Sequence, residues 1–299
     1  MMAGPQSRLR AAGAHWRLGR ALALAGALVG LLAACGSDRP KPTALEPLTP
    51  KIAGRQVWQA KLDGIGFPLG VAVREGRFIV AGNDGTVLAL EAGNGREVWR
   101  GQVGQRLSAG VGSDGRYAAV VTNGNDVVTL DAGREIWRAR MPARTLTPPL
   151  VAGERVFVMS VDRVVHAFDA RDGRRLWVLQ RPGDALTLGQ GGLLTAVGDT
   201  LVVGADASDR ITAYRQSSGE MAWTSERLLY RGLSGFLGAG TSIIVGDFEG
   251  QVHFLDRDSG QPMLRLPTDG SPVVGTPVAS GTTLLVTTRS GGLFAFRPE

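Results

Sequence analysis

Apolar residues fall in short, nearly continuous runs that tight turns join in pairs along most of the chain. Arg77–Ala81 is separated from Thr86–Leu90 by Asn83-Asp84-Gly85, and a Glu-Gly turn separates a similar pair around Gly250. Such turns supply the positive φ that hairpins need. Continuous rather than alternating apolar runs predict strands that are covered on both faces. No stretch after residue 35 has the long 3.6-residue period of a helix.

One phrase returns six times: an apolar strand, usually ended by an acidic residue, then a glycine and a tryptophan. The tryptophans are Trp99, Trp137, Trp177 and Trp223; Leu264 takes this place in the fifth copy, and the chain ends within the sixth. A repeat of about 40 residues is typical of β-propellers, in which each repeat forms one blade of four short strands. The sequence therefore predicts an all-β fold, a β-propeller of six four-stranded blades.

The two ends of the chain predict how the ring closes. The sixth copy stops before its tryptophan strand, whereas an unattached strand at 56–60 carries Trp58, one repeat length before Trp99. We therefore expect the N-terminal strand to pair with the C-terminal blade, because this pairing removes two open sheet edges.

Residues 1–34 have the pattern of a secretory signal peptide. Residues 1–20 contain four arginines and no acidic residue. The apolar stretch that follows them ends in Leu32-Ala33-Ala34-Cys35. This ending resembles the bacterial lipoprotein signal, in which the cysteine is freed by cleavage and acylated; an ordinary signal with an incidental cysteine is the alternative. Gly36 in place of Asp after the cysteine implies sorting to the outer membrane. Residues 35–56 are then the lipidated cysteine with a flexible tether, and 57–299 the propeller.

Charge and cysteine content exclude two classes of protein. Removal of residues 1–34 takes four arginines and no acidic residue, so the net charge falls from +6 to +2. No basic surplus of the kind that marks nucleic-acid-binding proteins remains. Cys35 is the only cysteine, which excludes a disulfide framework.

The residues that could carry chemistry are better explained as structural. His166 and His253 share one repeat position, which holds mostly apolar residues in the other copies, so we interpret both as packing residues rather than metal ligands or catalytic groups. Asp256–Gly260 lacks the spacing of a calcium loop, and the glycines of 110–115 precede a strand rather than a helix. The tryptophans are expected to lock neighbouring blades together. We predict no catalytic residue, no metal and no cofactor.

The repeat resembles the blade of quinoprotein-type propellers. Within that superfamily, Tyr230–Ser234 and Val245–Arg257, which contains Gly-Asp-Phe-Glu-Gly, resemble the BamB family. The resemblance covers nearly the whole chain. It implies a non-enzymatic scaffold lipoprotein of the outer-membrane β-barrel assembly machinery, on the periplasmic face of the outer membrane. Its partners would be the periplasmic domains of BamA, the other subunits of the complex and unfolded outer-membrane proteins.

The chain departs from that family in two respects. Members usually have eight blades, and here two repeats are missing where Leu201–Gly204 passes into Asp209–Thr212. The BamA-binding face of the family includes a Leu-x-Leu-Arg segment, which corresponds to Leu186, Leu188 and Gly189, with Gly189 in place of the arginine. An acidic segment of that face falls within the missing stretch. Leu186 and Leu188 also fit ordinary strand packing, so the resemblance implies a weakened contact with BamA.

Two other functions are open. The first is a pyrroloquinoline-quinone alcohol dehydrogenase, whose blades are related; that family uses a vicinal cysteine pair and a calcium site, and this chain has a single cysteine. The second is a generic propeller that binds periplasmic peptides, or a degenerate copy that no longer folds well.

Overall fold

The computed structural model describes residues 55–297, apart from 65, 68–69, 181–193 and 205–207. Cys35 and the segment before the propeller therefore lie outside the described residues. Residues 56–299 form one compact unit. Within the described part of the chain all regular secondary structure is β, which confirms the predicted class.

The unit contains six antiparallel sheets, five with four strands and the last with three. Their strands follow one another in chain order within each sheet. The first three blades are β1 (Ala72–Arg74), β2 (Arg77–Ala81), β3 (Thr86–Glu91) and β4 (Glu97–Gln102); β5 (Gly112–Ser113), β6 (Tyr117–Val121), β7 (Asp126–Asp131) and β8 (Arg134–Arg140); β9 (Leu150–Ala152), β10 (Arg155–Met159), β11 (Val164–Asp169) and β12 (Arg175–Gln180). The last three are β13 (Leu194–Val197), β14 (Thr200–Val203), β15 (Ile211–Arg215) and β16 (Met221–Ser225); β17 (Leu237–Ala239), β18 (Ser242–Gly246), β19 (Gln251–Asp256) and β20 (Pro262–Pro267); β21 (Val273–Ser280), β22 (Thr283–Thr288) and β23 (Leu293–Phe296).

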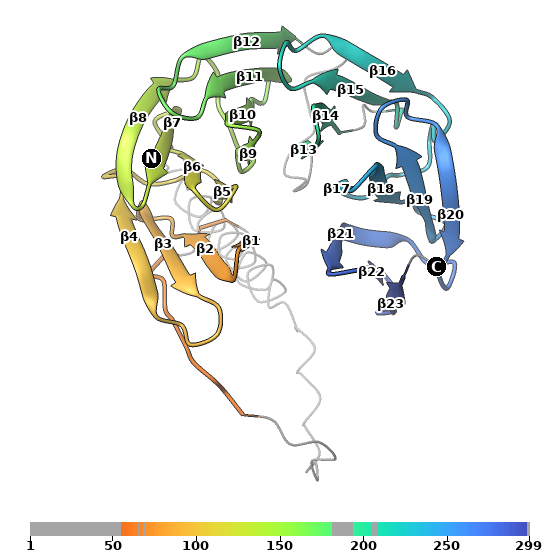
Figure 1. Ribbon diagram of the computed structural model, residues 1–299, viewed down its shortest axis with the longest axis horizontal. Coiled ribbons are helices and arrows are strands. Elements are labelled where there is room, and N and C mark those ends of the chain that lie inside the picture. Colours follow the sequence, from red (N-terminus) through yellow and green to blue (C-terminus); the bar gives the residue numbers. More distant parts are fainter. Residues whose placement is uncertain (1–54, 65, 68–69, 181–193, 205–207, 298–299) are drawn as a thin grey trace, which may run out of the picture. The chain divides into compact units, whose positions relative to one another are not determined.

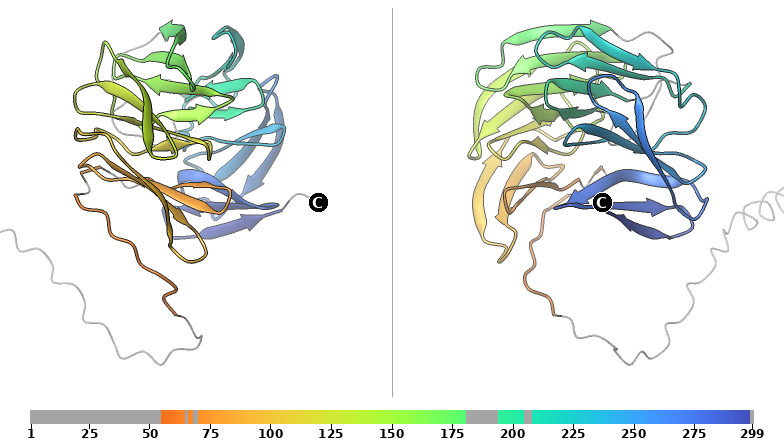
Figure 2. Two further views of the ribbon diagram at one scale, coloured as in Figure 1. Left: turned by 60° about the vertical axis from the view of Figure 1, so that its left-hand side comes forward. Right: turned by 45° about the vertical axis from the view of Figure 1, so that its right-hand side comes forward.

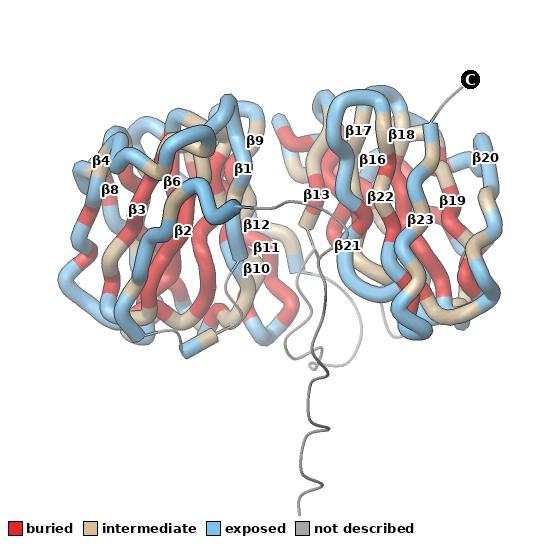
Figure 3. Tube along the Cα trace, turned by 90° about the horizontal axis from the view of Figure 1, so that it is seen from below, coloured by how far each residue is buried: buried red, intermediate tan, exposed pale blue. Residues whose placement is uncertain are grey.

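Successive blades of this unit pack face to face and follow an arc in chain order (Figures 1 and 2). The two middle strands of a blade are the most buried: all five residues of β6 are buried, as are the first five of β7 (Figure 3). Side chains of adjacent sheets form one apolar cluster after another, as when Val121 and Val127 of the second blade meet Phe168 of the third. Because neighbouring blades cover both faces of each sheet, consecutive strand residues are apolar and do not alternate with polar ones.

Each tryptophan packs on the blade that follows its own. Trp137 on β8 donates from Nε1 to the carbonyl oxygen of Ala170 in the third blade, at 2.8 Å. A Cβ atom built on Gly173 would lie 2.6 Å from its indole, so only glycine fits there. Trp177 and Trp223 make the same pair of contacts one and two blades further along, with Gln216 and Gly219, and with Arg257 and Gly260. The expectation that the tryptophans lock neighbouring blades is confirmed.

The ring closure predicted from the chain ends is not shown. Residues 56–61 form no regular strand, and Trp58 packs on the first blade, where its Nε1 donates to the carbonyl of Ala92 at 2.9 Å. The last sheet consists of β21, β22 and β23 only. Pairing of residues 56–60 with β23 therefore stays a prediction.

The fourth blade spans the junction between Gly204 and Asp209, where the sequence predicts that two repeats are missing. Its strands β14 and β15 pair over four residue pairs, from Thr200 opposite Arg215 to Val203 opposite Thr212. Both outer strands are present, and Trp177 and Trp223 dock as they do elsewhere in the array. The shortened chain thus forms a regular blade from strands on the two sides of the junction.

Candidate partner-binding rim

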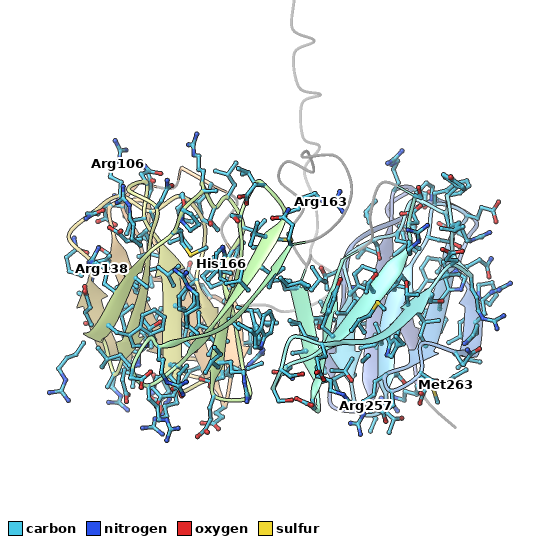
Figure 4. All side chains as sticks on the ribbon, turned by 90° about the horizontal axis from the view of Figure 1, so that it is seen from above. Arg106, Arg138, Arg163, His166, Arg257 and Met263 are labelled. Carbon is cyan, nitrogen blue, oxygen red and sulfur yellow. The ribbon has the colours of Figure 1, made fainter. Side chains whose placement is uncertain are left out.

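One end of the sheets carries the connections between blades, and we term it the connection rim. It comprises the turns between the second and third strands of each blade and the segments that lead to the next blade. Backbone hydrogen bonds join the two kinds of loop, as from Leu107 to Asn83 (3.0 Å) and from Phe248 to Arg231 (2.9 Å). Figure 4 shows Arg106 and Arg163 at this rim, and Arg257 and Met263 at the opposite end.

The predicted partner-binding residues Leu186, Leu188 and Gly189 fall in 181–193, outside the described residues. The strands on either side still locate the ends of this segment. Gln180, the last residue of β12, donates from its side chain to the carbonyl of Asp162 in a rim turn, at 3.2 Å. Leu194, the first residue of β13, pairs with Val203 at the rim end of β14. Both ends of the segment are therefore at the connection rim.

A buried carboxylate organises the described part of this rim. Asp247 follows β18 and is fully buried. Its Oδ2 accepts a hydrogen bond from Arg231 and lies 2.8 Å from Nε2 of His253; its Oδ1 accepts from the backbone N–H groups of Glu249 (3.0 Å) and Gln251 (2.9 Å). Burial alone would raise the pKa of Asp247, but the hydrogen bonds from His253, Gln251 and Arg231 outweigh it and hold the pKa below its usual value.

His253 is held neutral by its surroundings. Burial lowers its pKa, and the hydrogen bond to Asp247 opposes that effect without overcoming it. Because the carboxylate of Asp247 only accepts, Nε2 of the neutral ring carries the proton and donates. The prediction that His253 and His166 are internal packing residues is confirmed: they are 3% and 2% exposed.

The connection 226–236 is fastened from the blades on both sides. The carboxylate of Asp209, from the fourth blade, accepts from the backbone N–H groups of Gly232 (2.6 Å) and Leu233 (3.2 Å). Arg231 reaches Asp247 and Glu249 of the fifth blade. Tyr230 has φ of +55°, in the left-handed region that non-glycine residues rarely adopt, so these contacts hold a strained backbone in place.

Two aromatic side chains project from this fastened loop pair. Among the described residues the exposed aromatic side chains are Tyr230, 73% exposed, and Phe248, 46% exposed. Both belong to adjacent loops of the connection rim, since Phe248 bonds Arg231 through its backbone. Aromatic side chains on a rigid backbone lose little entropy on binding and recur at the centres of protein interfaces. This part of the rim is suited to contact with another protein.

Comparison with known proteins decides the family. The model of the family described as outer membrane protein assembly factor BamB matches residues 45–107, 83–226 and 207–299. The chain belongs to the BamB family. It is 29% identical to BamB of Burkholderia pseudomallei, over 91% of this chain and 96% of that protein. It is 30% identical to BamB of Bordetella pertussis, over 94% of this chain and 98% of that protein.

Solved structures agree on the fold. BamB of Moraxella catarrhalis is 22% identical and superimposes with a TM-score of 0.52 over 80% of this chain and 87% of that one. The designed protein Ika8, 13% identical, gives 0.60 over 79% of this chain and 73% of its own. At these identities the likeness speaks for the fold alone. The relatives, which are assembly factors, favour the assembly function over a quinone dehydrogenase.

The alignments also measure the missing repeats. The match to Burkholderia BamB runs over 367 positions, whereas 91% of 299 residues is about 272. About 95 positions of that relative thus have no counterpart here, which corresponds to two repeats of 40 to 50 residues. This length difference supports the predicted loss of two repeats.

Sequence reasoning missed the carboxylates that fasten the rim. The position of Asp247 is held by Gly82, Thr122, Ser160 and Thr288 in other blades. The sequence did carry a signal for this site: one repeat has an aspartate at a position where the other repeats have glycine, serine or threonine. Among the residues that the structure describes, no three His, Cys, Asp or Glu side chains gather as metal ligands, and no helix is long and apolar enough to cross a bilayer.

Proposed function

We propose that this chain is a non-enzymatic scaffold subunit of the machinery that assembles outer-membrane β-barrel proteins. The observation that carries the proposal is the match of the BamB family model to consecutive stretches from residue 45 to residue 299. Relatives matched over nearly their full length bear the name outer membrane protein assembly factor. The chain would act by holding other proteins together rather than by a reaction of its own.

The proposed anchor is a lipid on Cys35, which places the propeller on the periplasmic face of the outer membrane. Residues 1–34 would be the cleaved signal, 35–56 the tether and 57–299 the propeller. Two or three acyl chains suffice for stable anchoring, whereas one is marginal. Cys35→Ser should leave uncleaved precursor without acyl label, as seen by metabolic labelling with a fatty acid. Normally processed, unlabelled wild-type protein in the periplasmic fraction would contradict the anchor.

The proposed partners are the periplasmic domains of BamA, together with other subunits of the complex and unfolded barrel proteins. The contact with BamA is assigned to the connection rim, with Leu186 and Leu188 as its apolar part. Gly189 lacks the guanidinium that the family has there, and loss of one partner of a charged interface pair costs about 2–5 kcal/mol. We therefore expect binding to BamA at least tenfold weaker than that of eight-bladed relatives.

The test is a pull-down with the periplasmic domains of the cognate BamA. Weak capture of wild type, loss of capture with Leu186→Ala/Leu188→Ala and a gain with Gly189→Arg are expected. Met221→Ala, an exposed side chain on the outer strand β16, is the matched control and should bind like wild type. Strong capture that neither rim variant changes would place the interface elsewhere. Tight, stoichiometric binding of pyrroloquinoline quinone with calcium, followed by absorbance, would instead favour the dehydrogenase.

A further inference from the structure

One tryptophan of the array lacks the hydrogen bond that anchors the others. Trp99 lies on β4, opposite Ala89, and is half-buried against the core between the first two blades. In the part of the chain that the structure describes, the other tryptophans donate from Nε1 to a backbone carbonyl at 2.7–3.0 Å: Trp58, Trp137, Trp177 and Trp223. Trp99 has no such acceptor among the described residues, and its Nε1 is not an enclosed atom. This N–H is therefore open to solvent.

A short turn in the second blade explains the difference. In the third blade the carbonyl that accepts from Trp137 belongs to Ala170, the first of four turn residues between β11 and β12. The corresponding turn between β7 and β8 has only two residues, Ala132 and Gly133, as in tight two-residue hairpins. The chain turns back two residues earlier, so no carbonyl of this turn accepts from Trp99.

A second hydrogen bond is missing at the same place. Ala170 donates its backbone N–H to the carbonyl of Glu154 at 2.9 Å, which ties the turn after β11 to the turn before β10. The equivalent residues of three other blades make the same bond: Ala92, Gln216 and Arg257. Within the described residues Ala132 makes no such bond to the turn before β6. The second blade thus lacks one acceptor and one donor that the other blades supply beside the indole.

A pocket of about 570 Å³ opens where these contacts are missing. It lies between the first two blades, at the end of the sheets that carries Arg257 and lies opposite the connection rim (Figure 4). Turns of the two blades meet beneath it, since a Cβ atom on Gly115 would lie 3.3 Å from Cβ of Arg74 and 3.7 Å from the carboxyl carbon of Glu75. Trp99 contributes an apolar wall, and the charged side chains around it are Glu75, Arg77, Asp114, Arg116 and Asp131.

The charged groups of this pocket nearly balance, with two guanidinium groups against three carboxylates. Arg116 lies 3.6 Å from Asp131, and Oδ1 of Asp114 accepts from the backbone N–H groups of Arg116 (3.0 Å) and Tyr117 (2.8 Å). Neither an anion nor a cation finds a large surplus of the opposite charge here. Donors and acceptors lie side by side, and hydroxyl and amide groups both donate and accept. The pocket therefore suits a neutral ligand that is rich in such groups.

We propose that this pocket binds a neutral N-acetylated amino sugar. The C–H groups on one face of a pyranose ring would pack on the indole of Trp99, and its hydroxyls would bond the carboxylates and guanidinium groups. The acetamido carbonyl would accept from Nε1 of Trp99, as a backbone carbonyl does from the other tryptophans. The volume is within the range of small-molecule sites. This activity goes beyond the proposed scaffold function, which needs no small-molecule ligand.

The binding test uses the full chain, purified from membranes in a detergent without sugar groups and labelled with fluorotryptophan. In fluorine NMR, N,N′-diacetylchitobiose should shift the signal of Trp99, which Trp99→Phe assigns, and leave that of Trp223 in place. Cellobiose has hydroxyls instead of acetamido groups and should bind about tenfold more weakly, because the indole N–H then loses its carbonyl acceptor. No shift of the Trp99 signal, or equal binding of the two disaccharides, overturns the proposal.

Matched surface variants test the charged wall without disturbing the core. Arg116→Ala should weaken binding of N,N′-diacetylchitobiose about tenfold. Arg174→Ala is the control: Arg174 is 66% exposed against 64% for Arg116, and it pairs with Asp169 as Arg116 pairs with Asp131. This control should bind like wild type. Equal binding by the two variants overturns the assignment to this pocket.

A longer turn tests the origin of the site. The turn of the third blade reads Asp-Ala-Arg-Asp-Gly-Arg over 169–174, and that of the second reads Asp-Ala-Gly-Arg over 131–134. Insertion of Arg-Asp between Ala132 and Gly133 makes the two identical. It should give Trp99 its carbonyl, fill the pocket and abolish binding of the disaccharide, while the protein resists urea at least as well as wild type. A folded insertion variant that binds like wild type overturns the proposal.

Two further probes define the ligand class and its source. Triglycine carries amides without a ring, and if it binds as tightly as the disaccharide, the pocket belongs to a peptide backbone and the proposal is overturned. Capture of the chain on insoluble cell-wall glycan, reversed by the disaccharide, would assign the amino sugar to that polymer. Binding of the disaccharide without such capture would assign it to a soluble saccharide. Either result supports an amino-sugar site.

A pull-down with the periplasmic domains of BamA separates this inference from the proposed function. The pocket lies at the end opposite the connection rim, so Arg116→Ala and the insertion variant should be captured as wild type is. Unchanged capture without any binding of the disaccharide means that this inference fails while the proposed function stands. Disaccharide binding by a wild type that BamA does not capture means the reverse.

Discussion

The indole ring of Trp58 packs against the backbone of Gly95, although the repeat places the two residues in different blades. A Cβ atom on Gly95 would lie 2.6 Å from the indole, and the indole Nε1 donates to the carbonyl of Ala92 at 2.9 Å. Trp137 and Gly173 form an equivalent pair between the second and third blades. Trp58 therefore makes the contact of a fourth strand from a blade that precedes the first.

Gly95→Ala should destabilise the protein more than Gly76→Ala, another glycine of the first blade. The two have φ of +71° and +70°, but a Cβ on Gly76 meets nothing within 4 Å. Gly76→Ala should therefore cost only the backbone term of about 1–2 kcal/mol. Gly95→Ala adds the displacement of Trp58 and should cost about 1–3 kcal/mol more. Urea denaturation of both variants measures the difference, and equal losses would contradict the packing role of Gly95.

Deletion of residues 56–61 should destabilise the unit, because it uncovers the apolar face of the first blade. Trp58 covers Val80, Leu88 and Leu90 there. If the segment also closes the ring, as the chain ends predict, the whole array should unfold at a lower temperature in one transition. If it covers only the first blade, hydrogen exchange should rise in β1–β4 alone. An unchanged thermal midpoint would contradict both roles.

His166→Leu should stabilise the protein by about 1–2 kcal/mol. His166 is 2% exposed, and neither ring nitrogen has a hydrogen-bond partner among the described residues. Leu88 occupies the same repeat position in the first blade, so leucine fits this environment. His253→Leu is the matched control and should destabilise, because Asp247 loses a partner. Urea titrations at pH 7.5 compare the two, and a loss of stability in His166→Leu would show that its ring nitrogens are satisfied.

The stability of the wild type should fall as the pH is lowered from 7.5 to 5. Burial lowers the pKa of His166 below its usual value of 6.5, so between the two values the unfolded chain binds more protons than the folded one. This stability is fully present above about pH 6.5 and is lost as the pH falls toward the pKa of the folded state. The decline should be shallower in His166→Leu, as measured by urea titrations across the range. Parallel curves for the two proteins would contradict this assignment.

Asp247→Asn should cost about 3 kcal/mol and loosen the connection rim. Asparagine keeps the shape of the side chain but leaves the guanidinium of Arg231 without its buried carboxylate. Asp258→Asn is the control, since its ion pair with Arg257 is at the surface and should contribute little. Urea titration gives the loss, and hydrogen exchange should rise within 226–236 first. Equal stability of both variants would contradict a fastening role for Asp247.

The repeat phrase alone was sufficient to predict the class and the number of blades. Strand runs, turn glycines and tryptophan spacing are local signals, and the same local signals recur in every repeat. The predicted loss of two repeats came from the same kind of comparison, at the junction between Gly204 and Asp209. The structural reading of His166 and His253 also came from comparison of equivalent positions.

Contacts between repeats were decided only in the tertiary structure. The sequence phrase places each glycine and tryptophan in one repeat, but Trp137 packs on Gly173 of the next blade, 36 residues further along the chain. His166 and His253 are equivalent in sequence, yet only His253 finds a carboxylate. Leu293 is equivalent to the buried Val87 and is exposed. Equivalent residues share their local conformation, whereas cover, hydrogen-bond partners and charge come from the neighbouring blade, which differs at each place in the array.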